Sequence, residues 1–415
     1  MKVLITTDLY KSQINGVVTS VLNLYTELKE LGVDVRILTL SKTMKSYNEG
    51  DVYFISSFPV NIYPDIRASI AVKDKYLKEL INWAPDIIHT QCEFSTLIFA
   101  KIIAKKVKCP IVHTYHTMYE SCVGYIFKNE RMGKKLISKV MKQLLKKCDR
   151  IIAPTKKVKK NLERYKIKND ISIIPTGIDL FRFETDFSKE EILELKSDIN
   201  IPEDDFVILF LGRIAKEKNI DELIRHYNNL SSKRSNISFL IVGDGPYLEI
   251  LSNKVNTLKN KKVFFTGMVD PSEVYKYYKL ADVFVCASKS ETQGLTFVEA
   301  AANSLPLVCK YDSCLDGLLI NGKDGYFFNS GQDFEKSILK LADDENLRRE
   351  FALNAKEISK KYSKEYFAKS VYDLYEEVIS NYRYIPTVKR RVYKVKKATK
   401  RQFRKLKGIV NRYIK

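Results

Sequence analysis

The residues in this chain best suited to chemistry are two glutamates, Glu291 and Glu299, with seven residues between them. The apolar run at 282–288 predicts a buried strand, and the segment at 297–303 predicts a helix. We therefore expect Glu291 in the loop at the carboxyl end of the strand, and Glu299 about two turns inside the helix. One carboxylate could bind the hydroxyls of a sugar and the other those of a ribose, which points to a sugar nucleotide. Alternatively, neither glutamate binds a ligand: one lies in a loop, the other is solvated on a helix, and their spacing is due to chance.

Two residues between the glutamates, Gly294 and Leu295, fall where the helix is expected to begin. A helix start presents unpaired N–H groups and the positive end of the helix dipole, and both favour an anion. The position therefore suits the phosphate of a nucleotide as well as the start of an ordinary helix.

Other polar residues also follow predicted strands. Arg213 ends an apolar run, and Lys218 comes five residues later at the start of a helical pattern. Gly16 follows the first strand after a loop, where the missing side chain lets the backbone approach a phosphate or an acceptor. His116 ends another apolar run. Each of these residues could also have an ordinary structural role. Arg213 and Lys218 could be solvated, Gly16 could form a turn, and His116 could be a structural histidine.

The order of these motifs resembles that of the retaining glycosyltransferases of family 4, which have the two-domain GT-B fold. The resemblance runs from residue 1 to about residue 378. Three segments, 85–95, 113–121 and 290–300, are more narrowly similar to the bacterial branch of the family that glucosylates diacylglycerol. The resemblance implies a hexosyltransferase that moves a hexose, with glucose expected, from a UDP-sugar to a membrane lipid such as diacylglycerol.

The resemblance also implies a role for each residue of the site. His116 and Glu291 would be the catalytic residues, with His116 near the donor sugar and Glu291 in contact with it. Glu299 would bind the ribose of the donor. The residues expected to bind the donor diphosphate are Arg213, Lys218, Gly16, Gly294 and Leu295. Two fixed cations at that point would stabilise the negative charge that the leaving diphosphate gains.

The expected chemistry uses neither a metal nor a cofactor. Many sugar transferases bind a divalent metal on the diphosphate through a D-x-D motif, and this sequence contains none. The stereochemistry of the resembling family implies retention at the anomeric carbon. Because no side chain stands out as a covalent nucleophile, we expect front-face displacement, in which the leaving phosphate accepts the proton of the acceptor.

Strands and helices alternate along the chain, which predicts doubly wound parallel sheets of the α/β class. A chain of 415 residues is long enough for two domains. We expect an N-terminal acceptor-binding Rossmann-like domain at 1–180 and a C-terminal nucleotide-sugar-binding one at 200–360, facing a cleft and joined by a linker at 178–200. The resemblance implies that helices near 362–380 cross back to the first domain, and a basic tail at 383–415 follows.

The composition is that of an ordinary globular protein, with 45% hydrophobic residues. The amino terminus shows no secretion signal, and no window approaches the roughly 20 apolar residues of a spanning helix. The seven cysteines form no C-x2-C pair and indicate reduced core thiols. We therefore expect a cytoplasmic protein.

The net charge of +21 is concentrated in two segments. The segment at 383–415 contains fourteen Lys or Arg and no acid. The segment at 128–150 contains nine Lys or Arg, and its apolar residues recur at helical spacing. Both segments predict basic amphipathic helices that would associate peripherally with anionic lipid on the inner face of the cell membrane. The alternatives are a domain helix with solvated lysines at 128–150 and a solvated tail. The candidate membrane-binding residues are Lys134, Lys135, Lys142, Lys146, Lys389, Arg390, Arg391, Lys396 and Lys397.

Two other functions fit parts of the sequence. An enzyme with the same donor chemistry could instead extend a capsule, teichoic acid or lipopolysaccharide glycan. A basic nucleic-acid-binding protein would account for tail aromatics, such as Tyr393 and Phe403, that alternate with lysines. That class leaves the paired glutamates unexplained, so we expect no specific nucleic-acid partner.

Overall fold

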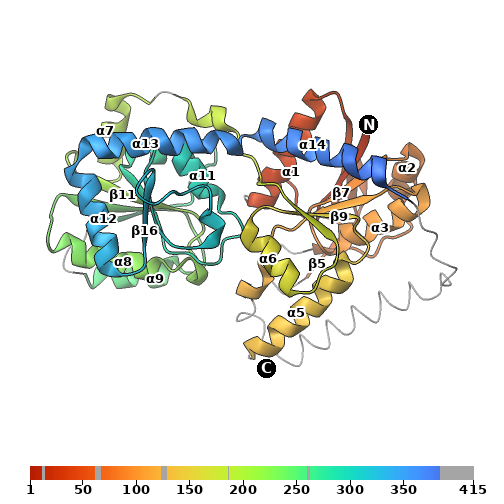
Figure 1. Cartoon of the computed structure of the whole chain (residues 1–415), viewed down its shortest axis with the longest axis horizontal. Helices are drawn as coiled ribbons and strands as arrows, with labels where there is room; N and C mark the ends of the chain where they lie inside the picture. Colours follow the sequence, from red (N-terminus) through yellow and green to blue (C-terminus); the bar gives the residue numbers. More distant parts are fainter. Residues whose placement is uncertain (12–14, 61–66, 123–128, 186, 259–261, 384–415) are drawn as a thin grey trace.

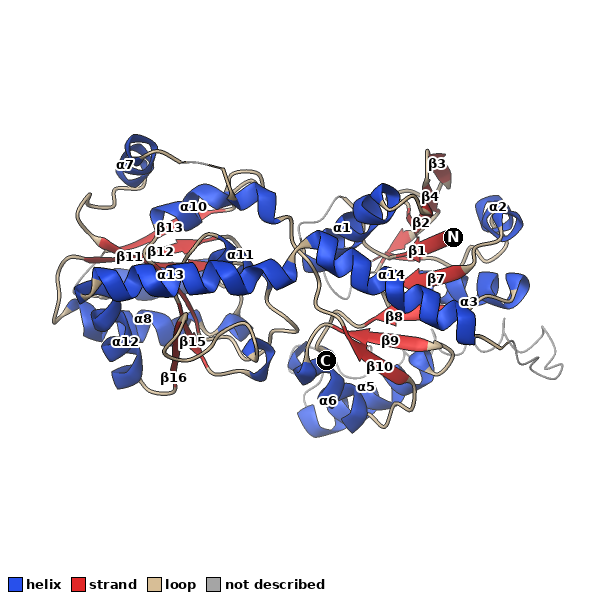
Figure 2. Cartoon of the chain, turned by 45° about the horizontal axis from the view of Figure 1, so that its top comes forward, coloured by secondary structure: helices blue, strands red, loops and turns tan. Residues whose placement is uncertain are grey.

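The structure is a computed structural model that describes residues 1–11, 15–60, 67–122, 129–185, 187–258 and 262–383. Its elements form two α/β halves, each built on a parallel sheet with helices on both faces (Figures 1 and 2). The basic tail predicted at 383–415 lies outside the described residues from residue 384 onward. The candidates in that segment, also outside, are Lys389, Arg390, Arg391, Lys396 and Lys397.

The first half is built on an eight-stranded sheet in the order β10-β9-β8-β7-β1-β2-β4-β3. All neighbouring strands are parallel except β3 and β4. Its strands are β1 Lys2–Thr6, β2 Asp34–Leu40, β3 Tyr47–Glu49, β4 Val52–Ile55, β7 Ile87–Thr90, β8 Ile111–Thr114, β9 Arg150–Ala153 and β10 Asp170–Ile173. Its helices are α1 Gly16–Glu30, α2 Lys75–Trp83, α3 Ser95–Val107, α5 Glu130–Leu145, α6 Lys156–Arg164 and the 3-10 turn η1 Tyr119–Cys122. A separate two-stranded sheet pairs β5 Phe58–Pro59 with β6 Arg67–Ala68.

The second half is built on a six-stranded parallel sheet in the order β13-β12-β11-β14-β15-β16. Its strands are β11 Phe206–Leu211, β12 Ile237–Val242, β13 Val263–Gly267, β14 Val283–Cys286, β15 Leu307–Lys310 and β16 Gly325–Phe328. Its helices are α7 Lys189–Asp198, α8 Ile220–Ser231, α9 Leu248–Asn256, α10 Val274–Leu280, α11 Leu295–Ala302, α12 Gly331–Asp343 and α13 Glu345–Ser359. The 3-10 turns are η2 Leu180–Phe183, η3 Lys216–Lys218, η4 Ser313–Leu315 and η5 Lys360–Tyr362, and the last helix is α14 Lys364–Asn381.

Helix α14 returns to the first half and lies along α1 (Figure 1). Its buried Phe367 and Tyr375 join Val21 of α1 in one apolar cluster. The chain passes close to the start of α14 at Gly177, where an added Cβ would lie only 2.7 Å from the Cα of Lys364. Glycine is therefore required at this crossing, because any side chain would displace the helix.

The segment at 178–200, expected to link the two domains, is more structured than a linker. It contains η2 and α7, and α7 contacts α10 of the second half. Phe183 of η2 is buried in the core of that half. The segment therefore packs on the second sheet instead of spanning the two halves freely.

Helices cover both faces of each sheet, so central strands such as β7, β8, β12 and β14 are buried along their whole length, without alternation. All four residues of β14 are buried, which places the loop that follows it at the edge of a rigid core. Six cysteines are buried free thiols, which confirms for them the prediction of reduced core residues: Cys92, Cys109, Cys148, Cys286, Cys309 and Cys314.

Candidate active site

Glu291 and Lys218 form the centre of the candidate site. Glu291 lies in the loop between β14 and α11, and Lys218 ends the 3-10 turn that follows β11. Lys218 Nζ donates to Glu291 Oε1 at 2.6 Å, so two residues 73 positions apart are in contact. Burial acts to raise the pKa of Glu291, but the charge of Lys218 and its hydrogen bond outweigh burial and hold that pKa below its ordinary value. The two side chains are therefore an ion pair at neutral pH.

Glu299 lies on α11, close to the start of that helix. The helix begins at Leu295, directly after Gly294, whose φ of 76° is in the left-handed region that favours glycine. Glu299 is therefore about one turn inside the helix, and the expectation of about two turns was wrong. Its Oε2 accepts a hydrogen bond from Tyr278 at 2.8 Å, and burial raises its pKa although this bond opposes the rise. Tyr278 of α10 thus fixes the direction of the carboxylate.

Arg213 follows β11 near the same edge of the second sheet. Its Nη2 donates to Glu217 Oε1 at 2.9 Å, and 46% of its side chain is exposed. An exposed pair of this kind contributes little stability, so Arg213 can exchange Glu217 for an anionic ligand at small cost. In the part of the chain that the structure describes, no three His, Cys, Asp or Glu side chains are grouped to hold a metal ion. Arg213 and Lys218 are cationic side chains that follow β11 at this edge.

Gly16 is the first residue of α1 and comes from the opposite half of the molecule. The side chain of Asn15 caps the helix by accepting hydrogen bonds from the N–H groups of Val17 and Val18. Across the boundary between the halves, Gly16 meets the side chain of Leu295. The structure therefore brings together two of the residues that sequence analysis assigned to the diphosphate.

His116 follows β8 and is half-buried. Its Nε2 lies 2.6 Å from Gln91 Oε1, so Nε2 is the donor in this bond. Burial, together with the nearby His113, lowers the pKa of His116 to about 3, which keeps the imidazole neutral. Its backbone oxygen accepts from Thr292 Oγ1 at 2.8 Å, so His116 contacts the loop that carries the site. Neither Gln91 nor Thr292 was predicted from the sequence to have a role.

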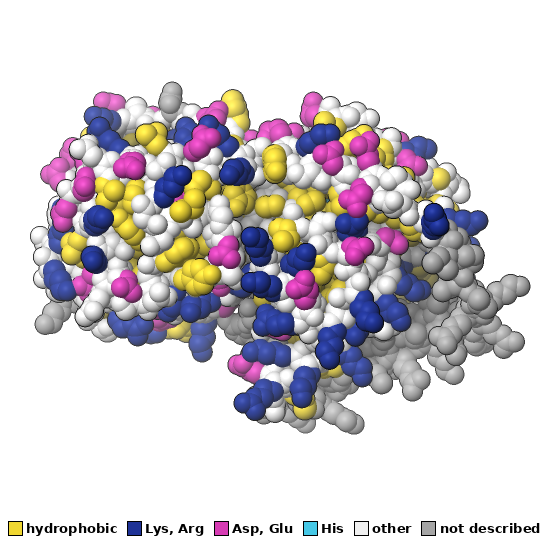
Figure 3. Space-filling view, in the orientation of Figure 1, with side chains coloured by type: hydrophobic (Ala, Val, Ile, Leu, Met, Phe, Trp, Pro, Cys, Tyr) yellow, Lys and Arg dark blue, Asp and Glu magenta, His cyan; other side chains and the backbone are white. Residues whose placement is uncertain are grey.

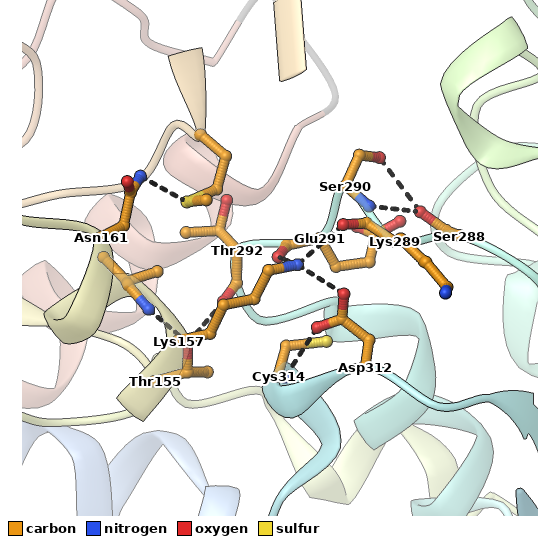
Figure 4. Close-up of polar contacts among 12 residues, drawn as sticks. Thr155, Lys157, Asn161, Ser288, Lys289, Ser290, Glu291, Thr292, Asp312 and Cys314 are labelled. Carbon is orange, nitrogen blue, oxygen red and sulfur yellow. Dashed lines mark hydrogen bonds and ion pairs between the residues drawn. The ribbon is translucent and has the colours of Figure 1, made fainter. Parts of the chain in front are cut away.

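The loop between β14 and α11 is bonded to the first half at several points (Figure 4). Thr155 Oγ1 donates to the carbonyl of Thr292 at 2.8 Å. The side chain of Gln293 forms two bonds with the backbone of Thr176, also at 2.8 Å. Lys157 of α6 reaches the same loop. These partners are more than a hundred positions from the loop, and no sequence signal marked them.

Helix α5, predicted as a basic amphipathic segment, contributes its last turns to the core. Met141 and Leu145 are buried, whereas Met132 in the first turn is 51% exposed. Lys and Arg side chains gather over the region of α5 and α6 (Figures 1 and 3). The exposed candidates are Lys134, Lys135 and Lys142 on α5 and Lys146 directly after it. Among the described helices, none combines the length and the apolar character needed to cross a membrane.

Family models match both halves of the chain. The model described as Glycosyltransferase Family 4 matches residues 14–182, and the one described as Glycosyl transferases group 1 matches residues 191–358. The alpha-monoglucosyldiacylglycerol synthase of Acholeplasma laidlawii is 35% identical over 389 residues, which are 91% of this chain and 98% of that protein. The synthase of the same name from Streptococcus pneumoniae is 34% identical over 388 residues, which are 92% of this chain and 87% of that protein.

A solved structure shares the arrangement of the two halves. The crystal structure of Anabaena HepE in complex with UDP and glucose superposes with a TM-score of 0.71 at 15% identity, covering 91% of this chain and 100% of HepE. At that identity the likeness concerns the fold alone. It confirms the predicted GT-B arrangement of two parallel-sheet α/β halves.

Proposed function

Because the chain belongs to glycosyltransferase family 4, we propose that it transfers a glucosyl group from UDP-glucose to diacylglycerol. The observation that carries the proposal is the likeness to two alpha-monoglucosyldiacylglycerol synthases over nearly the whole chain. That likeness includes the first half, which in our proposal binds the acceptor. It therefore bears on the lipid acceptor as well as on the donor.

The donor site in this proposal is centred on the ion pair of Lys218 and Glu291. Their side chains are in contact, so a donor whose diphosphate binds Lys218 has its sugar beside Glu291. Arg213 supplies a second cation for the diphosphate, and Glu299 binds the ribose hydroxyls. Negative charge builds up on the diphosphate as its bond to the sugar breaks, and fixed cations stabilise this charge in the transition state.

We further propose that the reaction proceeds with retention and without a metal. The acceptor oxygen bonds to the anomeric carbon on the face from which the diphosphate leaves. The proton of the acceptor hydroxyl passes to an oxygen of the leaving diphosphate, which balances its new charge. His116 is suited to hydrogen bonding with the sugar as a neutral group, because its lowered pKa of about 3 excludes an imidazolium at neutral pH.

A diacylglycerol acceptor resides in a membrane, so the enzyme must work at a lipid surface. We propose that it binds there peripherally, on the inner face of the cell membrane. The exposed lysines of α5 and the basic residues of the tail supply the charge for attraction to anionic lipid.

A product assay tests the proposal. The purified chain is incubated with UDP-glucose or UDP-galactose and with either vesicles that contain diacylglycerol or oligosaccharides, and the products are identified by mass spectrometry. We expect a monoglucosyl product from UDP-glucose, with the α configuration by NMR. A product formed only with oligosaccharide acceptors would contradict the lipid acceptor, and a β-linked product would contradict retention.

A further inference from the structure

Lys157 connects the two halves of the molecule at the loop that carries Glu291. It is the second residue of α6, yet its Nζ contacts three acceptors of the other half (Figure 4). The distances are 2.9 Å to the carbonyl oxygen of Lys289, 2.9 Å to that of Glu291 and 2.7 Å to Asp312 Oδ2. An ammonium group has three donors, so each one is matched by an acceptor.

This arrangement lies largely out of contact with water. The side chains of Lys157 and Asp312 are only 14% and 8% exposed. The other carboxylate oxygen of Asp312 accepts from the N–H of Cys314 at 2.8 Å, which fixes the carboxylate on η4. Removing one member of such a shielded pair leaves the other charge without compensation, so the pair resists separation.

The position of the contact matters more than its strength. Lys157 binds the backbone oxygen of Glu291 itself, while Lys218 binds its carboxylate. The next two residues, Thr292 and Gln293, are bonded to the first half as well. The conformation of the loop around Glu291 therefore depends on the first half being in place.

We propose that Lys157 is a positioning residue that sets the backbone of Glu291 toward the donor sugar when the two halves meet. The proposal rests on the proposed function, because it takes Glu291 to contact the sugar. Without Lys157 the nucleotide can still bind the second half, but the sugar-facing carboxylate is misplaced. Displacements of about 1 Å at a reacting group can reduce turnover by about 100-fold.

The test compares Lys157→Met with Lys156→Met, which removes an equal charge from the neighbouring exposed position of the same helix. We expect Lys157→Met to lower kcat for glucosyl transfer by 10-fold or more, with the Kd for UDP within twofold of the parent. The Lys156→Met control should match the parent in both. Near-parental kcat in a folded Lys157→Met protein would overturn the proposal, and so would a loss of UDP affinity equal to the loss of turnover.

A second variant and a second measurement keep the test independent of folding and of the substrate. If Lys157→Met does not fold, Asp312→Asn takes its place in the test. This variant removes the charge that pairs with Lys157 but keeps an oxygen for the N–H of Cys314, and it should also lower kcat. Small-angle X-ray scattering with UDP should give a larger radius of gyration for Lys157→Met than for Lys156→Met. If the parent fails to glucosylate diacylglycerol, the proposed function fails, whereas equal radii for the two variants contradict the role of Lys157 in joining the halves.

Discussion

The Cδ1 atom of Leu295 lies 3.4 Å from the point that a Cβ would occupy at Gly16. These residues are the first of α11 and of α1, so the amino ends of two helices from opposite halves meet. Each helix start carries N–H groups without intrahelical partners, and together they make the region favourable for an anion. Both residues were predicted from the sequence to bind the diphosphate, although their contact was not foreseen.

The first prediction concerns the space at Gly16. Gly16→Ala adds one methyl at ordinary contact distance from Leu295, so the halves can still meet and kcat should fall less than in a variant with a larger side chain. Gly16→Val places further methyl groups against Leu295 and should lower kcat by about 10- to 100-fold by keeping the halves apart. Steady-state kinetics with thermal unfolding as the folding control make the comparison. Equal kcat values for the two variants would show that this contact is unimportant.

The second prediction concerns the cations of the donor site. Lys218→Met should lower turnover by about 100-fold, on the scale of losing one preorganised group that stabilises developing negative charge. Arg213→Ala should act in the same direction. Lys216→Met is the matched control, because Lys216 lies in the same turn and is exposed. Normal turnover in folded Lys218→Met and Arg213→Ala proteins would remove both residues from the site.

The third prediction separates the two glutamates by titration with UDP alone. Glu299→Gln should weaken UDP binding, because the ribose loses a charged acceptor. Glu291→Gln should lower turnover more than UDP affinity, and His116→Ala should behave like it. If Glu291→Gln abolishes UDP binding while Glu299→Gln leaves it unchanged, the two roles are reversed.

The parts of the site that could be predicted are those encoded locally. The order of strand, turn and helix around Gly294 is visible because the hydrophobic period changes there. The start of the helix at Gly294 and Leu295 was predicted, but the depth of Glu299 was not, because the four residues from Leu295 to Glu299 make only about one turn. Lys157 escaped notice because it is 134 positions from Glu291, and only the packing of the halves brings them together. The fold was more accessible, since alternating buried strands and helices allow few arrangements.

The fourth prediction is a pH dependence of stability that originates at Asp8. Its Oδ1 accepts from the N–H of Thr96, whereas its Oδ2 is shielded and has no hydrogen-bond partner among the described residues. Burial raises the pKa of Asp8 from 3.8 to about 6, although the bonds with Thr96 oppose the rise. The folded state therefore binds this proton more tightly, and the free energy of unfolding falls as the pH rises from about 4 to about 6.

Asp8→Asn removes this titration but keeps an oxygen for the N–H of Thr96. Relative to the parent, the variant should therefore gain stability between pH 4 and pH 7, by at most about 3 kcal/mol. The measurement is the midpoint of thermal unfolding of both proteins at several pH values in that range. Other titrating groups contribute equally to both proteins, so the difference between the midpoints reports Asp8. Parallel pH profiles for the two proteins would contradict the prediction.

The last prediction concerns attachment to the membrane, for which the chain has two basic candidates. The tail at 383–415 carries fourteen Lys or Arg without an acid, and each basic residue near an anionic surface can contribute about 1 kcal/mol. Half of them would suffice for stable attachment that weakens as salt screens the charges. Deleting 383–415 should release the enzyme from vesicles with anionic lipid while leaving UDP-glucose hydrolysis intact, and high salt should mimic the deletion. Sedimentation with the vesicles measures both effects. If the truncated protein still sediments fully, the exposed lysines on and directly after α5 become the anchor, and changing Lys134, Lys135, Lys142 and Lys146 to Gln should then release it.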